Sequence, residues 1–310
     1  MVKSQGRVFT PLVYALFYET NAFMVQSFMN AKKRREIMKK LVAALLTAAM
    51  VVGLCACGSS NNTAASTGAA STEGSGLTLT DGVLMVGVEI GYPPMEYFDE
   101  DGVTPIGFDM EMAAEIASRM GLKLQLVDTA WDGIFAGLDS NKYDMVMSSC
   151  SITPARKESY LMSEPYCQNA IELIVPNDSD ITGIDAVAGR TVAVQGETTS
   201  HDYLRDHETG CEIMDYDKVI NCFDEFKLGR VDSVLTDSVV AAYYLGDDAN
   251  NYHVVWVNED AEPIGVTYKK GNDALYAAVE EILNAMSADG TTAKIAAKYF
   301  GDSSSVDGLR

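Results

Sequence analysis

The stretch at residues 143–156, YDMVMSSCSITPAR, joins a strand, a polar turn and the start of a helix. Residues 143–148 have an apolar centre and the length of a strand that is buried in a parallel sheet. Thr153 and Pro154 are typical of a helix N-terminus, where a capping hydroxyl precedes a proline at the first helical position. A buried strand that leads through a short turn into a helix is the repeating unit of an α/β fold.

The same strand-to-helix pattern occurs on both sides of this stretch. The apolar run Val83–Val88 predicts a buried strand, and the helical spacing over 110–120 predicts a helix between a capping Asp109 and a terminating Gly121. Further strands are predicted at 122–126, 191–194 and 231–235, and further helices at 132–138, 199–206, 238–244, 272–287 and 291–299. This alternation indicates an α/β architecture with mainly parallel sheets.

Polar and aromatic side chains follow the ends of three predicted strands. They are Tyr92 after the strand at 83–88, Ser149 and Ser151 after the strand at 143–148, and Asp237 after the strand at 231–235. Ligands of open α/β sheets bind beyond the carboxyl ends of the strands. The sequence therefore predicts that these side chains meet in one binding site.

The composition narrows the classes of partner. Of 310 residues, 47% are hydrophobic and 22% are charged, which is ordinary for a globular chain long enough for two lobes. The net charge is −21, and after residue 56 the chain carries 15 basic and 42 acidic residues. Such an acidic body repels phosphate backbones, so nucleic acid is excluded as a partner.

Catalytic and metal-binding patterns do not emerge from the sequence. The three histidines, His201, His207 and His253, are dispersed and form no cluster with cysteines, so we expect no metal site and no cofactor. The chain also offers no Ser-His-Asp order and no Gly-rich phosphate loop. These observations favour binding over catalysis.

Residues 38–56 have the pattern of a signal peptide. Met38 and two lysines precede a 14-residue apolar run, which is too short to span a bilayer. The sequence LCAC at 54–57 resembles a bacterial lipobox, which implies cleavage before Cys57 and lipidation of its thiol. Modification of Cys55 and ordinary signal cleavage are the alternatives. A diacylglycerol would supply the two chains that stable anchoring requires.

The remaining terminal segments are assigned from composition. Residues 1–37 precede an internal start-like Met38, and we interpret them as a mis-called upstream extension, with a genuine N-terminal extension as the alternative. Residues 57–76 hold the lipidated cysteine and a small, polar, flexible tether. Residues 302–310 are expected to form a frayed tail.

Several short segments resemble the family 3 extracellular solute-binding proteins, the amino-acid receptors of ABC importers. The segments are YPPME at 92–96, GFD at 107–109, WDGI at 131–134, SSCSITPAR at 148–156, SEPY at 163–166, TD at 236–237, ADGT at 288–291 and KYFG at 298–301. The resemblance implies a periplasmic-binding-protein-like type II fold, in which two α/β lobes are joined by a hinge and enclose a cleft. The first lobe would comprise 77–168 and 266–301 and the second 172–262, with crossings near 168–173 and 262–266.

The resemblance also implies a function. The protein would be a receptor on the outer or periplasmic side of the cell membrane, held there by a lipid anchor. As a monomer without a cofactor, it would bind a free amino acid and deliver it to an ABC permease. The alternatives are an enzyme on the same scaffold, such as a dehydratase, and a tethered amino-acid sensor.

Matching positions imply roles for individual residues. Arg156 would bind the ligand carboxylate with its planar fork, helped by Ser149 and Ser151. Asp237 would bind the ammonium group, and its alternative role is to cap the helix that follows. Thr198 and Thr199 would offer backbone N–H groups at a helix start. Many relatives have Gly two residues after the position of Gln195, where this chain has Glu197.

Three further side chains would shape the ligand pocket. Tyr92 and Trp131 match the aromatic walls, although core packing is the alternative for Trp131. Glu89 matches an acid near the ligand side chain, which favours a polar or basic amino acid. Asp109 and Asp144 are assigned to capping and structure. Outside the pocket, Cys211 and Cys222 are a candidate disulfide, because an exported chain permits one.

Overall fold

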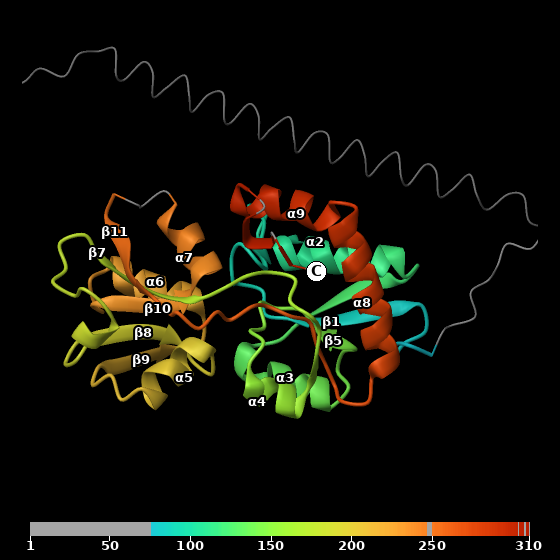
Figure 1. Cartoon of the computed structure of the whole chain (residues 1–310), viewed down its shortest axis with the longest axis horizontal. Coiled ribbons are helices and arrows are strands. Elements are labelled where there is room, and N and C mark those ends of the chain that lie inside the picture. The colour runs from blue at the N-terminus through green and yellow to red at the C-terminus, as the bar shows by residue number, and fades with distance from the viewer. Residues whose placement is uncertain (1–75, 247–249, 303, 307, 310) are drawn as a thin grey trace, which may run out of the picture. The chain divides into compact units, whose positions relative to one another are not determined.

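A computed structural model describes residues 76–246, 250–302, 304–306, 308 and 309 (Figure 1). The described residues fall within one compact unit, 70–310. The predicted signal peptide, Cys57, the start at Met38 and most of the tether lie outside the described residues. Within the part that the structure describes, no helix has the length and hydropathy needed to cross a membrane.

The first of two five-stranded sheets has the strand order β4-β1-β5-β12-β6. Its strands are β1 (Val83–Val88), β4 (Lys123–Asp128), β5 (Met145–Val146), β6 (Leu161–Met162) and β12 (Thr267–Tyr268). Its helices are α2 (Phe108–Arg119), α3 (Trp131–Asp139), α4 (Pro154–Ser159), α8 (Asp273–Ala288) and α9 (Thr291–Phe300). In Figure 1, α2, α8 and α9 lie over one face and α3 and α4 over the other. This sheet and these helices are termed the first lobe.

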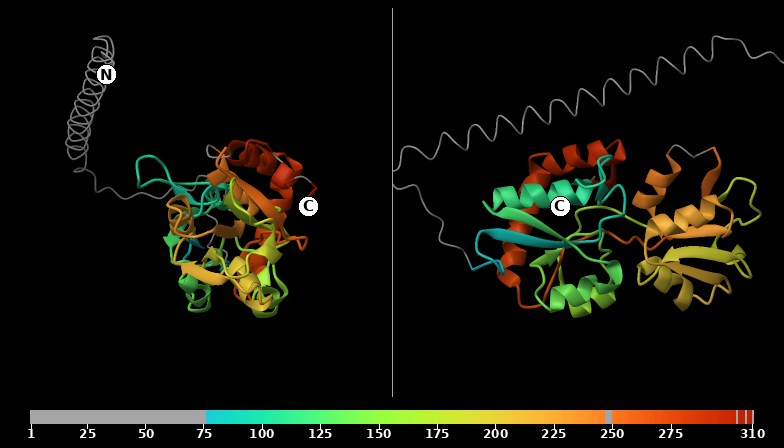
Figure 2. Two further views of the ribbon diagram at one scale, coloured as in Figure 1. Left: turned by 90° about the vertical axis from the view of Figure 1, so that its left-hand side faces the viewer. Right: turned by 180° about the vertical axis from the view of Figure 1, so that it is seen from behind.

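The second sheet has the order β11-β7-β10-β8-β9. Its strands are β7 (Ile171–Pro176), β8 (Thr191–Gln195), β9 (Glu212–Tyr216), β10 (Ser233–Asp237) and β11 (Tyr252–Val257). Its helices are α5 (Thr199–Asp206), α6 (Val219–Lys227) and α7 (Ser238–Leu245), with a 3-10 turn at Ile184–Ala186. Figures 1 and 2 show α6 and α7 on one face and α5 on the other. This sheet and these helices are termed the second lobe.

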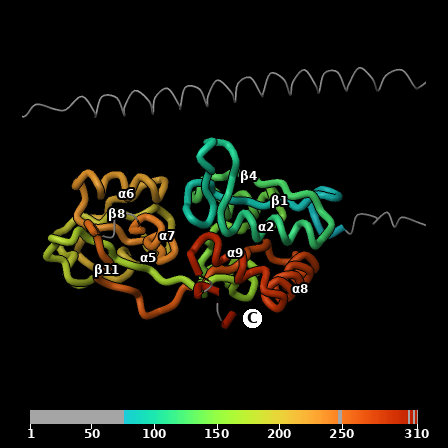
Figure 3. Tube along the Cα trace, turned by 90° about the horizontal axis from the view of Figure 1, so that it is seen from above, coloured from blue at the N-terminus to red at the C-terminus, as the bar shows by residue number. Residues whose placement is uncertain are grey.

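The chain passes between the lobes twice, after β6 and after β11, and the two passages lie side by side (Figure 3). Ile264 pairs with both Ser151 and Cys167, and the Ile264 N–H donates to the Cys167 carbonyl at 2.8 Å. A short hairpin of β2 (Tyr97–Phe98) and β3 (Pro105–Ile106) adjoins the first lobe. The predicted two-lobed α/β fold is confirmed.

The expectation of mainly parallel sheets is met only in part, because the two five-stranded sheets of the described chain have four parallel and four antiparallel strand pairs. In the first sheet β1 is parallel to β4 and β5, but β12 is antiparallel to its neighbours β5 and β6. In the second sheet β7 is likewise antiparallel to β10 and β11. The antiparallel strands β7 and β12 are those that follow the two passages between the lobes, where the chain enters a sheet without a crossover helix.

The expected cap of α2 is also wrong. The helix begins at Phe108 with Gly107 as its N-cap residue, and Asp109 lies inside the helix with no exposed surface. Its carboxylate accepts hydrogen bonds from the Ser149 N–H at 2.8 Å and the Tyr166 hydroxyl at 2.9 Å. Asp144 has the predicted structural role, because it accepts from the backbone N–H groups of Leu79 and Met85.

The candidate disulfide does not form, since Cys211 and Cys222 are both free. Cys211 packs with the apolar cluster on the α5 face of the second sheet, whereas Cys222 belongs to the cluster on the α6 face. The sheet therefore separates the two thiols.

The expectation of a frayed tail is not met by the residues described there. Ser304–Val306 forms a 3-10 turn, the Ser305 carbonyl accepts from the Gln168 N–H at 2.7 Å, and Val306 is buried in the core. Ser304–Val306 is therefore packed against the first lobe and the passage between the lobes.

Candidate functional site

A cavity lies between residues of the two lobes. It is lined by Glu89, Tyr92, Glu96, Trp131, Ser148, Ser149, Ser151, Arg156, Gln195, Thr198, Thr199 and Asp237. The structure thus brings together all nine ligand-site candidates from the sequence. It adds Glu96, Ser148 and Gln195, which the sequence analysis did not identify.

Arg156 is held at one side of the cavity by α4. The Thr153 hydroxyl accepts from the Arg156 N–H at 3.2 Å, which confirms the predicted cap. The Arg156 Nη1 donates to the Ser151 carbonyl at 3.0 Å, and its guanidinium carbon lies 5.3 Å from the centre of the Trp131 ring. Among the described residues, no carboxylate lies within 4.0 Å of this guanidinium, so its charge can attract an anionic ligand group.

Asp237 supplies a buried carboxyl group from the second lobe. It ends β10 and occupies the N-cap position of α7, but its side chain makes no capping hydrogen bond. Its Oδ2 instead accepts from the Tyr92 hydroxyl of the first lobe at 2.8 Å. Burial raises the pKa of Asp237, although the positive charge of Arg156 opposes that shift. The capping interpretation of this side chain is therefore wrong.

Two further acids lie in the first-lobe wall. Glu89 accepts from the Gln195 Nε2 at 2.7 Å, and Glu96 accepts from the Ser148 hydroxyl at 2.6 Å. The Ser148 hydroxyl in turn accepts from the Glu89 N–H at 3.0 Å. Burial raises the pKa of both carboxyls, and the Asp109 carboxyl behind the cavity raises that of Glu96 further. These acids form one connected network with the amide of Gln195.

Some polar atoms of the cavity lack a partner within the described part of the chain. They are the Glu96 Oε2, the Ser149 Oγ and the Gln195 Oε1. Ser149 adopts a left-handed backbone conformation with φ 47°, which places it in the turn that follows β5. Buried polar atoms are almost always hydrogen-bonded in folded proteins, so these atoms indicate a polar ligand.

The start of α5 closes the cavity from the second lobe. Thr198 is the N-cap residue, and its hydroxyl accepts from the His201 N–H at 3.3 Å. Glu197 takes the left-handed conformation with φ 60°, so it adopts a geometry that suits glycine. The Glu197 carbonyl accepts from the Trp131 Nε1 at 2.9 Å. Trp131 therefore contacts the second lobe as well as the apolar cluster of its own lobe.

Two of the three missed polar residues, Glu96 and Gln195, gave weak signals in the sequence. Glu96 lies in the segment YPPME, which was used only as a motif, and Gln195 is the last residue of β8. Both lie at the end of a strand or in the turn after one, where the rule that predicted Tyr92 and Asp237 also applies.

Comparisons with known proteins give a consistent result. The sequence model of the bacterial extracellular solute-binding proteins, family 3, matches residues 84–302. The L-cystine-binding protein TcyJ of Escherichia coli (strain K12) is 32% identical over 222 residues, covering 71% of this chain and 83% of that protein. The structure of an ancestral arginine-binding protein bound to arginine is 34% identical, with a TM-score of 0.68 and coverage of 71% of this chain and 99% of that one. The ancestral amino acid-binding protein AncCDT-1, a precursor of cyclohexadienyl dehydratase, is also 34% identical, with a TM-score of 0.66 and coverage of 71% and 96%.

Proposed function

This chain belongs to the bacterial extracellular solute-binding proteins of family 3, and we propose that it captures a free amino acid and delivers it to an ABC importer. One observation carries the proposal: the guanidinium of Arg156 and the carboxyl of Asp237 line a single cavity, from different lobes. A zwitterion requires one partner of each sign, because an unpaired charge is costly in a buried site.

Each end of the amino acid has a partner of suitable chemistry. The ligand carboxylate would bind the fork of Arg156, the hydroxyls of Ser149 and Ser151, and the start of α5 at Thr198 and Thr199. The ligand ammonium would bind Asp237, in competition with or beside the Tyr92 hydroxyl. Tyr92 and Trp131 would enclose the aliphatic stem.

The remaining polar groups favour a polar or basic side chain. Among the described residues that line the cavity, Glu89, Glu96 and Asp237 are acidic and Arg156 alone is basic. The names of the relatives point the same way, since they refer to cystine and to arginine. A ligand with hydrogen-bond donors at its far end would satisfy Glu96 Oε2 and Gln195 Oε1.

The two-lobe arrangement suggests how a permease would recognise that the receptor holds a ligand. We propose residues 77–168 and 266–301 as one rigid body and 172–262 as the other, with the paired passages at Ile264 as the hinge. A ligand that contacts both bodies stabilises the closed arrangement, as in the hinge closure of periplasmic binding proteins. A permease would then distinguish the loaded, monomeric receptor by its closure.

The N-terminal segment supports a place at the cell surface. We propose that Cys57 carries a lipid, and that the polar tether holds the folded body at the outer or periplasmic side of the membrane. Metabolic labelling with a fatty-acid probe tests the anchor: Cys57→Ala should abolish the label, and Cys55→Ala should leave it. Equal labelling in both variants would refute the assignment.

Isothermal titration tests the central proposal. Purified protein is titrated with the twenty amino acids and with L-cystine, and one of the polar or basic ligands should bind with a stoichiometry of one. Arg156→Ala should abolish that heat, whereas Lys157→Ala, a neighbouring exposed change of equal charge, should retain it. Equal affinity in both variants would refute the site.

An enzymatic activity on the same scaffold is the second candidate, favoured by the similarity to a precursor of a dehydratase. The relatives described above are named as binding proteins, which favours the first candidate. Mass spectrometry of the ligand after long incubation with the protein separates the two, because a receptor returns it unchanged and an enzyme does not.

A further inference from the structure

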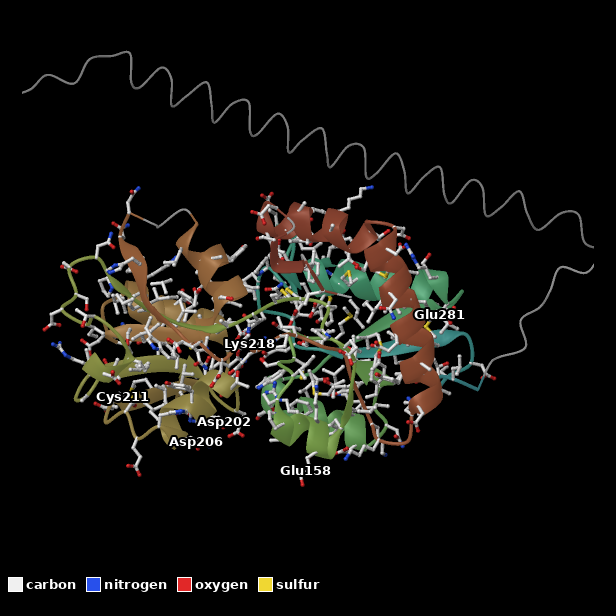
Figure 4. All side chains as sticks on the ribbon, viewed as in Figure 1. Glu158, Asp202, Asp206, Cys211, Lys218 and Glu281 are labelled. Atoms are coloured by element: carbon white, nitrogen blue, oxygen red, sulfur yellow. The ribbon has the colours of Figure 1, made fainter. Side chains whose placement is uncertain are left out.

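A lysine of the second lobe contacts the backbone of the first lobe. Lys218 lies between β9 and α6, and its Nζ donates to the Ile90 carbonyl at 3.0 Å. Ile90 directly follows the strand β1 and Glu89, and its N–H donates to Asp128 in the first lobe at 3.0 Å. Lys218 is not among the residues that line the cavity, and Figure 4 shows it on the side of the second lobe that faces the first.

The loop that receives Lys218 has a backbone suited to this contact. Gly91 has φ 138°, and a Cβ at this position would lie 3.4 Å from the Lys218 Nζ and 3.7 Å from its Cδ. The Gly91 N–H donates to the Glu96 carbonyl at 3.0 Å, in the same turn that presents Tyr92. Lys218 therefore packs over the loop that orients a cavity wall, while it makes no contact inside the cavity.

Other hydrogen bonds between the two lobes lie beside the contact of Lys218 with Ile90. The Gln195 Nε2 donates both to the Glu89 Oε2 at 2.7 Å and to the Asp217 carbonyl at 3.1 Å. The Gln195 amide thus links Glu89 to Asp217, and the Lys218 ammonium links the next residue of each segment, because it binds the Ile90 carbonyl. The positive charge of Lys218 also favours the ionised form of Glu89, which strengthens the amide contact.

We propose that Lys218 is a positioning residue that holds the two lobes in the closed arrangement without contacting the ligand. Closure brings Arg156 and Asp237 together, so a contact made only on closure raises the fraction of molecules that can bind. A hydrogen bond from a charged donor is stronger than one between neutral groups, which makes this contact large enough to shift a two-state equilibrium. The expected effect of Lys218 on ligand affinity rests on the proposed function, whereas its expected effect on closure of the lobes does not.

The chain contains its own reporter of closure. Trp131 and Trp256 are its two tryptophans, and the Trp131 indole N–H donates across the lobes to the Glu197 carbonyl. In a Trp256→Phe background without ligand, acrylamide quenching of fluorescence measures how far Trp131 is exposed. Lys218→Met should increase quenching, corresponding to a fall of about tenfold in the ratio of closed to open molecules. Lys218→Arg, which keeps a charged donor, should recover most of the protection.

Lys142→Met is the matched control. Lys142 is exposed, and its Nζ also donates to an oxygen at 3.0 Å, but the acceptor is Thr129 in the same lobe. This variant loses the same charge and one hydrogen bond, so quenching of Trp131 should not change. Equal quenching in Lys218→Met and Lys142→Met would overturn the proposal.

A binding measurement separates the proposal from the proposed function. With L-arginine as probe, stopped-flow fluorescence should show faster dissociation from Lys218→Met than from Lys142→Met, with similar association rates. Equal dissociation rates would contradict a role in ligand retention. If neither L-arginine nor any other amino acid binds, the proposed function fails, and the quenching comparison still decides whether Lys218 holds the lobes together.

Discussion

Replacing Asp237 by Asn should weaken ligand binding without weakening the fold. The carboxyl is buried at the end of β10, and its Oδ2 accepts a hydrogen bond from the Tyr92 hydroxyl at 2.8 Å. The isosteric amide retains an acceptor for that hydroxyl but removes the negative charge offered to an ammonium group. Loss of one partner from a buried, hydrogen-bonded charge pair costs about 2–5 kcal/mol. Affinity should therefore fall by at least about thirtyfold.

The free energy of unfolding of the Asp237→Asn variant should stay the same or increase at neutral pH, although its affinity for the ligand falls. Burial raises the pKa of Asp237 in the folded state, so ionisation of this group destabilises the fold. Its stabilising contribution is complete below the ordinary pKa of an aspartate and is lost as the pH rises through the raised value. The Asn variant has no such loss, so at neutral pH its stability should equal or exceed that of the unmodified protein.

Two measurements on the same samples check this reasoning. Titration calorimetry gives the affinity for the amino acid that the unmodified protein binds, and urea unfolding at pH 4 and pH 7 gives the stability. The expected result is a large loss of affinity, with a smaller fall in stability between the two pH values than in the unmodified protein. Unchanged affinity, or a loss of stability as large as the loss of binding energy, would show that Asp237 serves the fold and not the ligand.

Three other changes have defined outcomes. Glu197→Gly should raise the thermal midpoint, because a non-glycine residue at φ 60° costs about 1–2 kcal/mol, and a lower midpoint in calorimetry would contradict this. Gly107→Ala should destabilise by about 3 kcal/mol or more, since its Cβ would lie 2.1 Å from the Met95 carbonyl oxygen; near-normal urea unfolding would refute the contact. A thiol reagent should modify Cys211 before Cys222, whose pKa burial raises to about 12, and peptide mass spectrometry after brief labelling would reveal any reversed order.

The sequence predicted which residues lie at the site better than it predicted the hydrogen bonds between them. Tyr92 and Ser149 follow β1 and β5 of the first sheet, and Asp237 ends β10 of the second. Ligands of α/β sheets bind beyond the carboxyl ends of strands, so the place of each residue beside a site could be predicted from its position in the sequence. The partners could not be predicted in this way. The Tyr92 hydroxyl bonds to a residue 145 positions away, and the relative placement of the two lobes decides that contact.

The error at the start of α2 arose because the same local pattern fits two structural roles. A polar residue before an apolar helical run is typical of a cap, but Gly107 takes that place and Asp109 turns inward to bind Ser149 and Tyr166. The antiparallel strands β7 and β12 were not predicted as strands, and their direction depends on the neighbours with which they pair, whereas periodicity indicates only burial. Both features depend on chain segments that are distant in sequence.

The buried acids explain why the cavity needs both lobes and a ligand at once. Glu89, Glu96 and Asp237 are all buried, and burial raises the pKa of each, so closure over an empty site works against their ionisation. In the proposed site, a ligand that brings donors and a positive charge would relieve that cost, and Arg156 would require the same ligand to carry an anionic group. In the proposed site, a zwitterion with further donors would therefore favour closure, and a simple cation or a simple anion would leave Arg156 or Asp237 without a partner of opposite charge.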